Sequence, residues 1–390
     1  MNDLYLDYGT LFVPHIGEEL CGDQVVIKEH SDNLSIVVLA DGLGSGVKAN
    51  ILATMTATML STMVESEMDI EDSIHTIATT LPICQVRKVA YSTFTLLMIR
   101  NHNEIEMYQY DNPRAIILRN GLNYDYSMKS LKVDGKLIYH TRITLDENDA
   151  IILFSDGVTH AGVGNILNFG WDRNSICKYI EENYKEDASS KAISSMILSK
   201  TLELYNHSPM DDATVFTLKI RKRKQVNLLV GPPARKEDDR AMLSLFFSKS
   251  GKHIVCGGTT ANIVSNYLKS PIQMDLNYTS KDIPPTAVID GVDLVTEGVI
   301  TVAKVLEYAK GFVGDNTKYP DWKHLNDGAS KICQMLFEEA TDINFYSGCA
   351  VNPAHQNKDL PISFSIKMQL VEELSQCLKK MGKNIKVSYF

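Results

Sequence analysis

The sequence has no apolar run of the kind that crosses a bilayer and no cysteine pair of the kind that binds zinc. Its apolar stretches are shorter than the roughly 20 residues of a membrane-spanning helix. Residues 1–10 lack the basic start and apolar core of a signal peptide. The seven cysteines are scattered without a C-x-x-C pair, so reduced structural thiols are expected rather than a metal or disulfide framework. We therefore expect a cytoplasmic protein with no membrane partner.

Basic residues are also in the minority, with 39 Lys and Arg against 48 Asp and Glu and a formal net charge of -9. Nucleic acids are bound by a surplus of Lys and Arg, so this balance argues against a nucleic-acid partner. One short basic cluster stands at residues 221–224 (RKRK). We interpret it as a solvated strand end or linker, with a nucleic-acid patch as the alternative.

The chain is longer than one hydrophobic core usually supports, which favours two domains. In the first part, strands and paired helices alternate, in an order that suits two packed sheets with outer helices. We predict an α+β fold, a four-layer αββα sandwich of two antiparallel sheets with outer helices. The expected strands and helices are a hairpin over 24–40, helices at about 47–67 and 69–80, strands at 92–100, 103–111, 114–121 and 150–156, helical residues over 172–206, and a last strand at 211–220.

From about residue 225 the pattern changes to alternating single strands and helices. Strands are expected at 226–234, 252–258 and 286–293, and helices at 237–251, 259–270 and 297–312. This alternation predicts a separate, smaller α/β domain. We place the boundary at about 221–226 and expect domains over 1–222 and 223–390.

A methionine stripe marks the first expected helix, with Met55, Met59 and Met63 at i, i+4 and i+8. Unbranched thioethers fill irregular gaps, so we expect this stripe to pack in the core. The alternative is a groove for a partner.

Four aspartates stand where expected strands begin or end: Asp23, Asp41, Asp156 and Asp211. Any one Asp-Gly after a strand is most simply a turn. Crowded carboxylates cost free energy, however, and strand-end aspartates that converge normally do so around cations. Hard oxygen ligands select Mg²⁺ or Mn²⁺ over zinc.

The order of these motifs carries more information than each motif alone. GD is followed by DGLGSG opening a helix, then by SDG after an apolar strand, and then by DDAT leading into the last strand. Over about residues 1–220 this order resembles the metal-dependent protein phosphatase (PPM, type 2C) family, and within it the bacterial sporulation stage II (SpoIIE-type) branch. The segment Asn112-Pro113-Arg114 departs from the Gly-His-Pro-Pro run of that branch, and the phosphate-binding arginine of many eukaryotic members has no counterpart.

The resemblance implies two Mn²⁺ or Mg²⁺ ions and a role for each aspartate. Asp41 would bridge both metals, and the Gly42 carbonyl would be a further ligand. Asp156 and Asp211 would complete the site, with Asp23 as a ligand directly or through water. Asp41, Asp156 and Asp211 are thus the expected catalytic residues. Asp212 stands where the family has an asparagine, which leaves its role open.

The second domain contains a Gly-Gly turn and two threonines at the start of an expected helix: Gly257, Gly258, Thr259 and Thr260. Free helix amides and hydroxyls of this kind suit an anionic ligand, although the Walker lysine is missing. Asp290, after another strand, would join them if both turns lie at one sheet edge. An ordinary helix cap and an Asp-Gly turn are the alternatives.

Together these features predict a metal-dependent phosphatase that hydrolyses phosphoserine or phosphothreonine on a signalling protein by a metal-activated water. By resemblance, the substrate would be of the anti-sigma antagonist type. The second domain would regulate it by sensing a ligand, and the helix after Asp41 would be either an activity switch or a static packed helix. Two rival functions are a catalytically silent partner-binding module and a C-terminal domain with its own nucleotide-binding activity.

Overall fold

The computed structural model describes residues 3–31, 33–80, 92–164, 166–275, 283–315, 322, 325–350 and 362–390. These residues form two compact units, one ending at Lys222 and the other beginning at Arg223. Within the described ranges, no helix combines the length and apolar character that a bilayer span requires.

The first unit contains two sheets in which every neighbouring pair of strands is antiparallel. The mixed α+β class with antiparallel sheets is therefore confirmed. One sheet has the order β2-β3-β4-β5-β9-β8, formed by Asp23–Ser31, Leu34–Gly42, Ser92–Arg100, Glu104–Tyr110, Lys136–Thr144 and Lys129–Val133. The other has the order β1-β11-β10-β6-β7, formed by Leu4–Val13, Ala213–Lys222, Ala150–Phe154, Ile116–Arg119 and Leu122–Tyr124.

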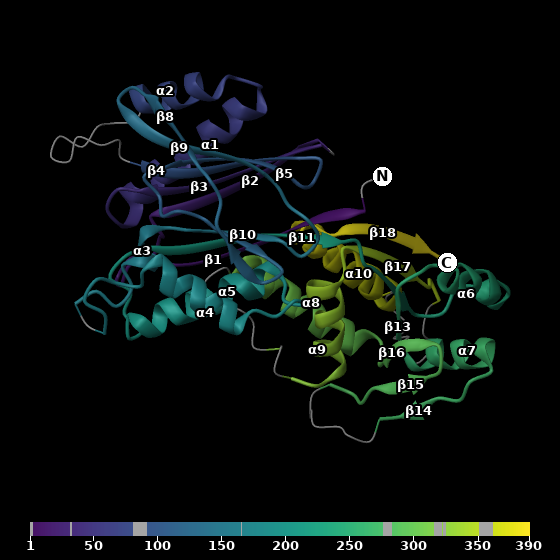
Figure 1. Ribbon diagram of the computed structural model, residues 1–390. Coiled ribbons are helices and arrows are strands. Elements are labelled where there is room, and N and C mark those ends of the chain that lie inside the picture. The colour runs from purple at the N-terminus through teal and green to yellow at the C-terminus, as the bar shows by residue number, and fades with distance from the viewer. Residues whose placement is uncertain are drawn as a thin grey trace. The chain divides into compact units, whose positions relative to one another are not determined.

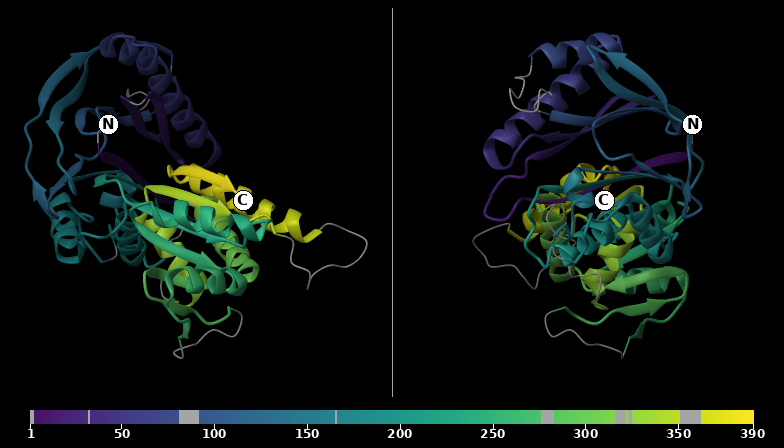
Figure 2. Two further views of the ribbon diagram at one scale, coloured as in Figure 1. Left: turned by 90° about the vertical axis from the view of Figure 1, so that its right-hand side faces the viewer. Right: turned by 60° about the vertical axis from the view of Figure 1, so that its left-hand side comes forward.

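Alternating strand residues explain why these two sheets pack against each other. Val37, Leu39 and Leu97 from the six-stranded sheet share one buried cluster with Leu153 and Phe216 from the five-stranded sheet. Helix α1 (Gly46–Glu65) packs on β2 and β3, and α2 (Ile70–Thr80) packs on α1. Figures 1 and 2 show both helices over the six-stranded sheet.

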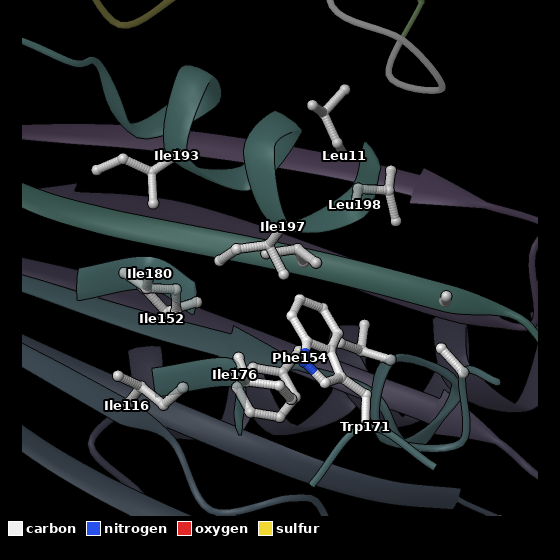
Figure 3. Close-up of a cluster of buried hydrophobic side chains, with 14 of the residues drawn as sticks. Leu11, Ile116, Ile152, Phe154, Trp171, Ile176, Ile180, Ile193, Ile197 and Leu198 are labelled. Carbon is white, nitrogen blue, oxygen red and sulfur yellow. The ribbon is translucent and has the colours of Figure 1, made fainter. Parts of the chain in front are cut away.

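A further buried cluster joins the five-stranded sheet to the helices α4 (Arg173–Asn183) and α5 (Ser190–Leu204). Figure 3 shows its apolar side chains meeting between helices and strands. The labelled members are Ile176 and Ile180 on α4, Ile193, Ile197 and Leu198 on α5, Leu11, Ile116, Ile152 and Phe154 on the strands, and Trp171 before α4. This cluster keeps β10 and β11, whose ends carry site residues, in fixed positions.

The structure gives the outcome of the remaining expectations about this unit. The residues expected to be helical over 172–206 form two helices, because the chain is not helical at Tyr184 and restarts where Ser189 caps α5 by accepting from the Ala192 amide. The strand β1 and the β8–β9 hairpin were not predicted. Pro82, the expected end of the second helix, lies outside the described residues.

The methionine stripe of α1 is only partly buried, because Met63 packs against the core cluster of the six-stranded sheet whereas Met55 does not. Small residues face the sheet instead, with Ala49, Ala53 and Ala57 fully buried, because they allow the helix to approach the strands closely. Met55 is 42% exposed. The expectation that the stripe packs in the core is therefore wrong for Met55.

Gly42 shows how close this approach is, since an added Cβ would lie 2.1 Å from the Ala49 carbonyl oxygen. We expect Gly42→Ala to destabilise the protein by about 1–3 kcal/mol, because either β3 or α1 must shift. Thermal unfolding of the metal-free protein measures this loss. Gly311→Ala is the matched control, because nothing lies within 4 Å of its Cβ position and alanine favours a helix. Equal melting temperatures for Gly42→Ala and the parent would contradict the close packing.

The second unit has a seven-stranded sheet of order β14-β15-β16-β13-β12-β17-β18. The strands in that order are Gln273–Met274, Ala287–Ile289, Val292–Thr296, Lys252–Cys256, Gln225–Val230, Asp342–Ser347 and Asn384–Tyr389. The five strands from β16 to β18 are parallel to one another. The chain moves outward from β12 to β16, then returns to β17 on the other side of β12, so the winding direction reverses between β12 and β17.

Helices cover both faces of this sheet. Helices α6 (Asp239–Phe247) and α7 (Gly258–Leu268) share one buried cluster with β12, β13 and β16. Helix α8 (Val299–Gly314) packs against α9 (Gly328–Cys333) and α10 (Ile362–Lys380), and Figure 1 shows these three on the other side. The segment expected as one strand over 286–293 is a hairpin, with β15 and β16 antiparallel around Asp290 and Gly291. Strands β17 and β18 were not predicted.

The basic cluster at 221–224 is largely paired in the structure. Arg221 lies 3.5 Å from Asp7, Lys222 lies 2.5 Å from Glu147, and Arg223 lies 3.1 Å from Asp342. These pairs hold the ends of β11 and the residues that follow it.

Candidate metal centre

The four predicted aspartates lie at the ends of strands from both sheets of the first unit. Asp23 begins β2 and stands directly opposite Asp41 near the end of β3. Asp156 follows β10, and Asp211 precedes β11, which pairs with β10. The structure therefore brings one pair of carboxylates from each sheet to a common end.

Electrostatic effects show that the pairs are close enough to interact. Burial, with the carboxylates of Asp23, Asp156 and Asp211, raises the pKa of Asp41 to about 10. Burial also raises the pKa of Asp211, with Asp156 adding to the effect. A proton or another positive charge at this end of the sheets relieves that cost.

Asp23 and Asp212 carry the strongest sign of an unmet partner. Both are 3% exposed. In the described part of the chain, neither side-chain oxygen of Asp23 has a hydrogen-bond partner of good geometry. The same holds for Oδ2 of Asp212. Burial raises the pKa of Asp23 well above its usual range; the nearby hydroxyls of Ser155 and Thr214 act to lower it, while Asp212 and Asp156 raise it further. Buried carboxylate oxygens of this kind are normally satisfied by hydrogen bonds, water or a metal.

His160 is a further candidate ligand that the sequence reasoning missed. Its Nδ1 lies 3.8 Å from Asp156 Oδ2 and 3.6 Å from Asp211 Oδ2. One ligand atom from each of the three residues lies within 4.8 Å of the others. The sequence signal that could have identified His160 is its i, i+4 spacing from Asp156. The short helix α3 (Asp156–Thr159), with His160 as its C-cap, turns both side chains to one side.

The turns that carry these ligands are fixed by neighbouring groups. Ser92 Oγ donates to the Asp41 carbonyl at 2.9 Å, and Tyr205 Oη donates to the Gly157 carbonyl at 2.7 Å. A Cβ on Gly157 would lie 2.1 Å from the Asp212 carbonyl oxygen. Glycine is therefore required after Asp156, which explains the Asp-Gly pair at this position.

The segment that departs from the SpoIIE pattern has a structural role in this chain. Asn112 Oδ1 accepts from Thr93 Oγ1 at 2.6 Å, and Thr93 on β4 is the residue paired with Asp41 on β3. The Arg114 guanidinium donates to Asp125 at 2.9 Å and lies over the Tyr126 ring at 4.4 Å. Arg114 is thus held against the protein at the start of β6.

The predicted ligand residues of the second unit are only partly brought together. Gly257 precedes α7, and Gly258, Thr259 and Thr260 form its first turn. Asp290 lies elsewhere, because β13 and β16 are parallel with Cys256 opposite Thr296. The end of β13 is therefore level with Glu297, whereas Asp290 precedes β16 at its other end. The condition under which Asp290 would join Gly257, a shared sheet edge, is therefore not met.

Residues 31–221 match the family model described as Stage II sporulation protein E (SpoIIE). This part of the chain, just under half of its 390 residues, is therefore a SpoIIE-type domain of that family. No curated protein sequence matches the chain.

Several solved structures are similar to part of the chain. The PP2C phosphatase domain of SpoIIE from Bacillus subtilis, with a fragment of its regulatory domain, is 18% identical, with a TM-score of 0.48, over 57% of this chain and 64% of that one. The SiaA PP2C domain of Pseudomonas aeruginosa is 13% identical, with a TM-score of 0.42, over 54% and 85%. RsbX in complex with magnesium is 19% identical, with a TM-score of 0.39, over 55% and 95%. At these values the likenesses carry no information on substrate or partner.

Proposed function

We propose that residues 1–222 form a SpoIIE-type metal-dependent phosphatase domain, built as a four-layer αββα sandwich. It hydrolyses phosphoserine and phosphothreonine on a signalling protein with two Mn²⁺ or Mg²⁺ ions. The observation that carries the proposal is the convergence of carboxylates whose buried oxygens have no partner of good geometry, at Asp23 and Asp212. Such an arrangement stabilises a bound cation and destabilises the metal-free protein.

The chemistry of the donor set fits hard divalent cations. Asp23, Asp41, Asp156 and Asp211 supply carboxylate oxygens, Gly42 supplies a carbonyl, and His160 is within reach of Asp156 and Asp211. Bound Mn²⁺ or Mg²⁺ activates water for attack on phosphorus and offsets the charge of the phosphoryl oxygens. The protein itself orients this set, because Asp23 and Asp41 are paired across β2 and β3.

The rival function, a catalytically silent partner-binding module, gives these carboxylates no role. Partner binding would not need crowded, buried carboxylates, whose mutual repulsion lowers stability. For the substrate we propose a phosphorylated protein of the anti-sigma antagonist type, on the sequence resemblance alone. We propose residues 223–390 as the regulatory, ligand-sensing domain.

Phosphate release from synthetic peptides tests the activity. With the purified full-length protein, we expect release from phosphoserine and phosphothreonine peptides in Mn²⁺ or Mg²⁺, and background rates in EDTA. Restoring the metal after chelation should restore the rate, which separates metal loss from irreversible unfolding. A phosphotyrosine peptide is the specificity control. Full activity in EDTA would exclude the proposed metal-dependent chemistry.

A further inference from the structure

The second unit has the topology in which ligands bind at one edge of a sheet. In an open parallel sheet, the helix that follows each strand begins at the carboxyl edge, and the crevice lies where the winding direction reverses. Here that reversal lies between β12 and β17. Helices α7, α8 and α10 each follow a parallel strand, so their N-termini lie toward this edge.

The turns at this edge are close neighbours. Gly231 follows β12, and its amide donates to the Cys256 carbonyl at 3.4 Å, while the Gly257 amide donates to the Thr296 carbonyl at 2.9 Å. Val230 is opposite Cys256 in the parallel register, so Gly231 comes level with Gly257. Gly257 has a φ of 113°, which L side chains rarely adopt. Both strands therefore end at a glycine, so no side chain of residue 231 or 257 covers the backbone there.

Lys367 on α10 places a buried ammonium group at the same edge. The residue is only 9% exposed, and a Cβ on Gly231 would lie 2.5 Å from Lys367 Nζ. Lys367 Nζ donates to the Ala350 carbonyl at 3.3 Å. No carboxylate of the described residues lies within 4.0 Å of it, whereas Lys252, Lys304 and Lys310 in the same unit each have one. Burial lowers the pKa of Lys367, and an anion beside its ammonium group would offset that cost of burial.

The first turn of α7 supplies hydrogen-bond donors at the same carboxyl edge of the sheet. No side chain caps the helix at Gly257, and Gly258 and Thr259 are exposed. The Thr260 hydroxyl is buried and has no partner within the described ranges, and it lies 3.2 Å from the Cβ position at Gly257. Free amides and a hydroxyl at a helix N-terminus are donors for a phosphoryl group.

We propose that the carboxyl edge of this sheet binds the phosphoryl group of a small molecule, with Lys367 as its counter-charge and the first-turn amides of α7 as donors. A phosphoryl group fits better than a carboxylate, because its larger charge and three acceptor oxygens match an ammonium group and several amides together. Gly231 makes room for Lys367 Nζ, and glycine at 257 allows the ligand to approach the backbone.

Inorganic phosphate is the probe, and the full chain is kept in EDTA so that the metal centre of the first unit stays empty. We expect saturating phosphate to raise the melting temperature by about 2–4 °C more in the parent than in Lys367→Met. Phosphate stabilises proteins generally, so the difference between the two proteins is the decisive quantity. Lys379→Met, an exposed lysine near the far end of α10, should respond like the parent.

A second variant tests the amide donors without a charge change. Gly258→Pro removes one amide at the first position of α7, where proline is well tolerated, and nothing lies within 4 Å of the Cβ position. We expect it to reduce the phosphate response while the melting temperature without phosphate is kept. Lys367→Met should melt no lower than the parent without phosphate, since it removes an uncompensated buried charge. The proposal is overturned if both variants respond like the parent, or if acetate stabilises the parent as much as phosphate does.

Discussion

Asp41→Asn is expected to lower phosphopeptide turnover by more than about 100-fold at saturating Mn²⁺, since it removes a charge at the centre of the proposed metal site. The same variant should lose most of the metal-induced rise in melting temperature. The backbone of this variant should be unaffected, because asparagine has nearly the same shape as the aspartate that it replaces on β3. Asp156→Asn and Asp211→Asn should reduce turnover strongly for the same reason.

Stability without metal separates a functional loss from misfolding. Asp41→Asn should melt at the same temperature as the metal-free parent or higher, because it removes the cost of burying an ionisable carboxyl beside Asp23, Asp156 and Asp211. Asp72→Asn, an exposed aspartate on α2, is the matched control and should leave turnover unchanged. If Asp41→Asn keeps more than about a tenth of the parent turnover with metal, the assignment of Asp41 is wrong.

The melting temperature of the metal-free protein is expected to fall as the pH rises from about 5 to 8, by on the order of 5 °C. Burial raises the folded-state pKa of Asp23, Asp41 and Asp211 above the ordinary 3.8. A carboxyl with a raised folded pKa stabilises the fold fully below its unfolded pKa. That contribution is lost as the pH rises toward the folded pKa, which is about 10 for Asp41.

The pH window stays below the range in which Lys219 would change the stability in the opposite direction. Burial lowers the pKa of Lys219 to about 8, so its unfavourable burial is relieved only as the pH rises above about 8. Within the window, added Mn²⁺ should raise the melting temperature more at the higher pH, because the cation competes with protons for the same oxygens.

Thermal melts of the parent, Asp23→Asn and Asp72→Asn across this window measure the effect. Asp23→Asn should flatten the pH dependence of the metal-free protein, and Asp72→Asn should leave it unchanged. A parent whose melting temperature is constant or rises with pH in EDTA would contradict a centre of crowded carboxylates.

The order of residues along the chain was enough to predict several parts of this protein. The β2–β3 hairpin, α1, α2, β4, β10 and β11 follow from local apolar patterns, and the aspartates stand at strand ends that these patterns mark. The SpoIIE-type resemblance rested on the same motifs and is confirmed over residues 31–221. The metal roles of the aspartates stay predictions.

Other features depended on contacts between residues far apart in the sequence. Which face of α1 is buried was decided by how closely the helix approaches the sheet, so alanines rather than Met55 lie inside. His160 joined Asp211 only through the pairing of β10 with β11. Strand direction, which local patterns do not encode, sets which turns share an edge of the second sheet. Asp290 therefore lies away from Gly257, whereas Lys367 lies at the edge where Gly231 and Gly257 stand. Sequence thus determined many of the elements and the acidic motifs, while tertiary packing decided which side chains meet.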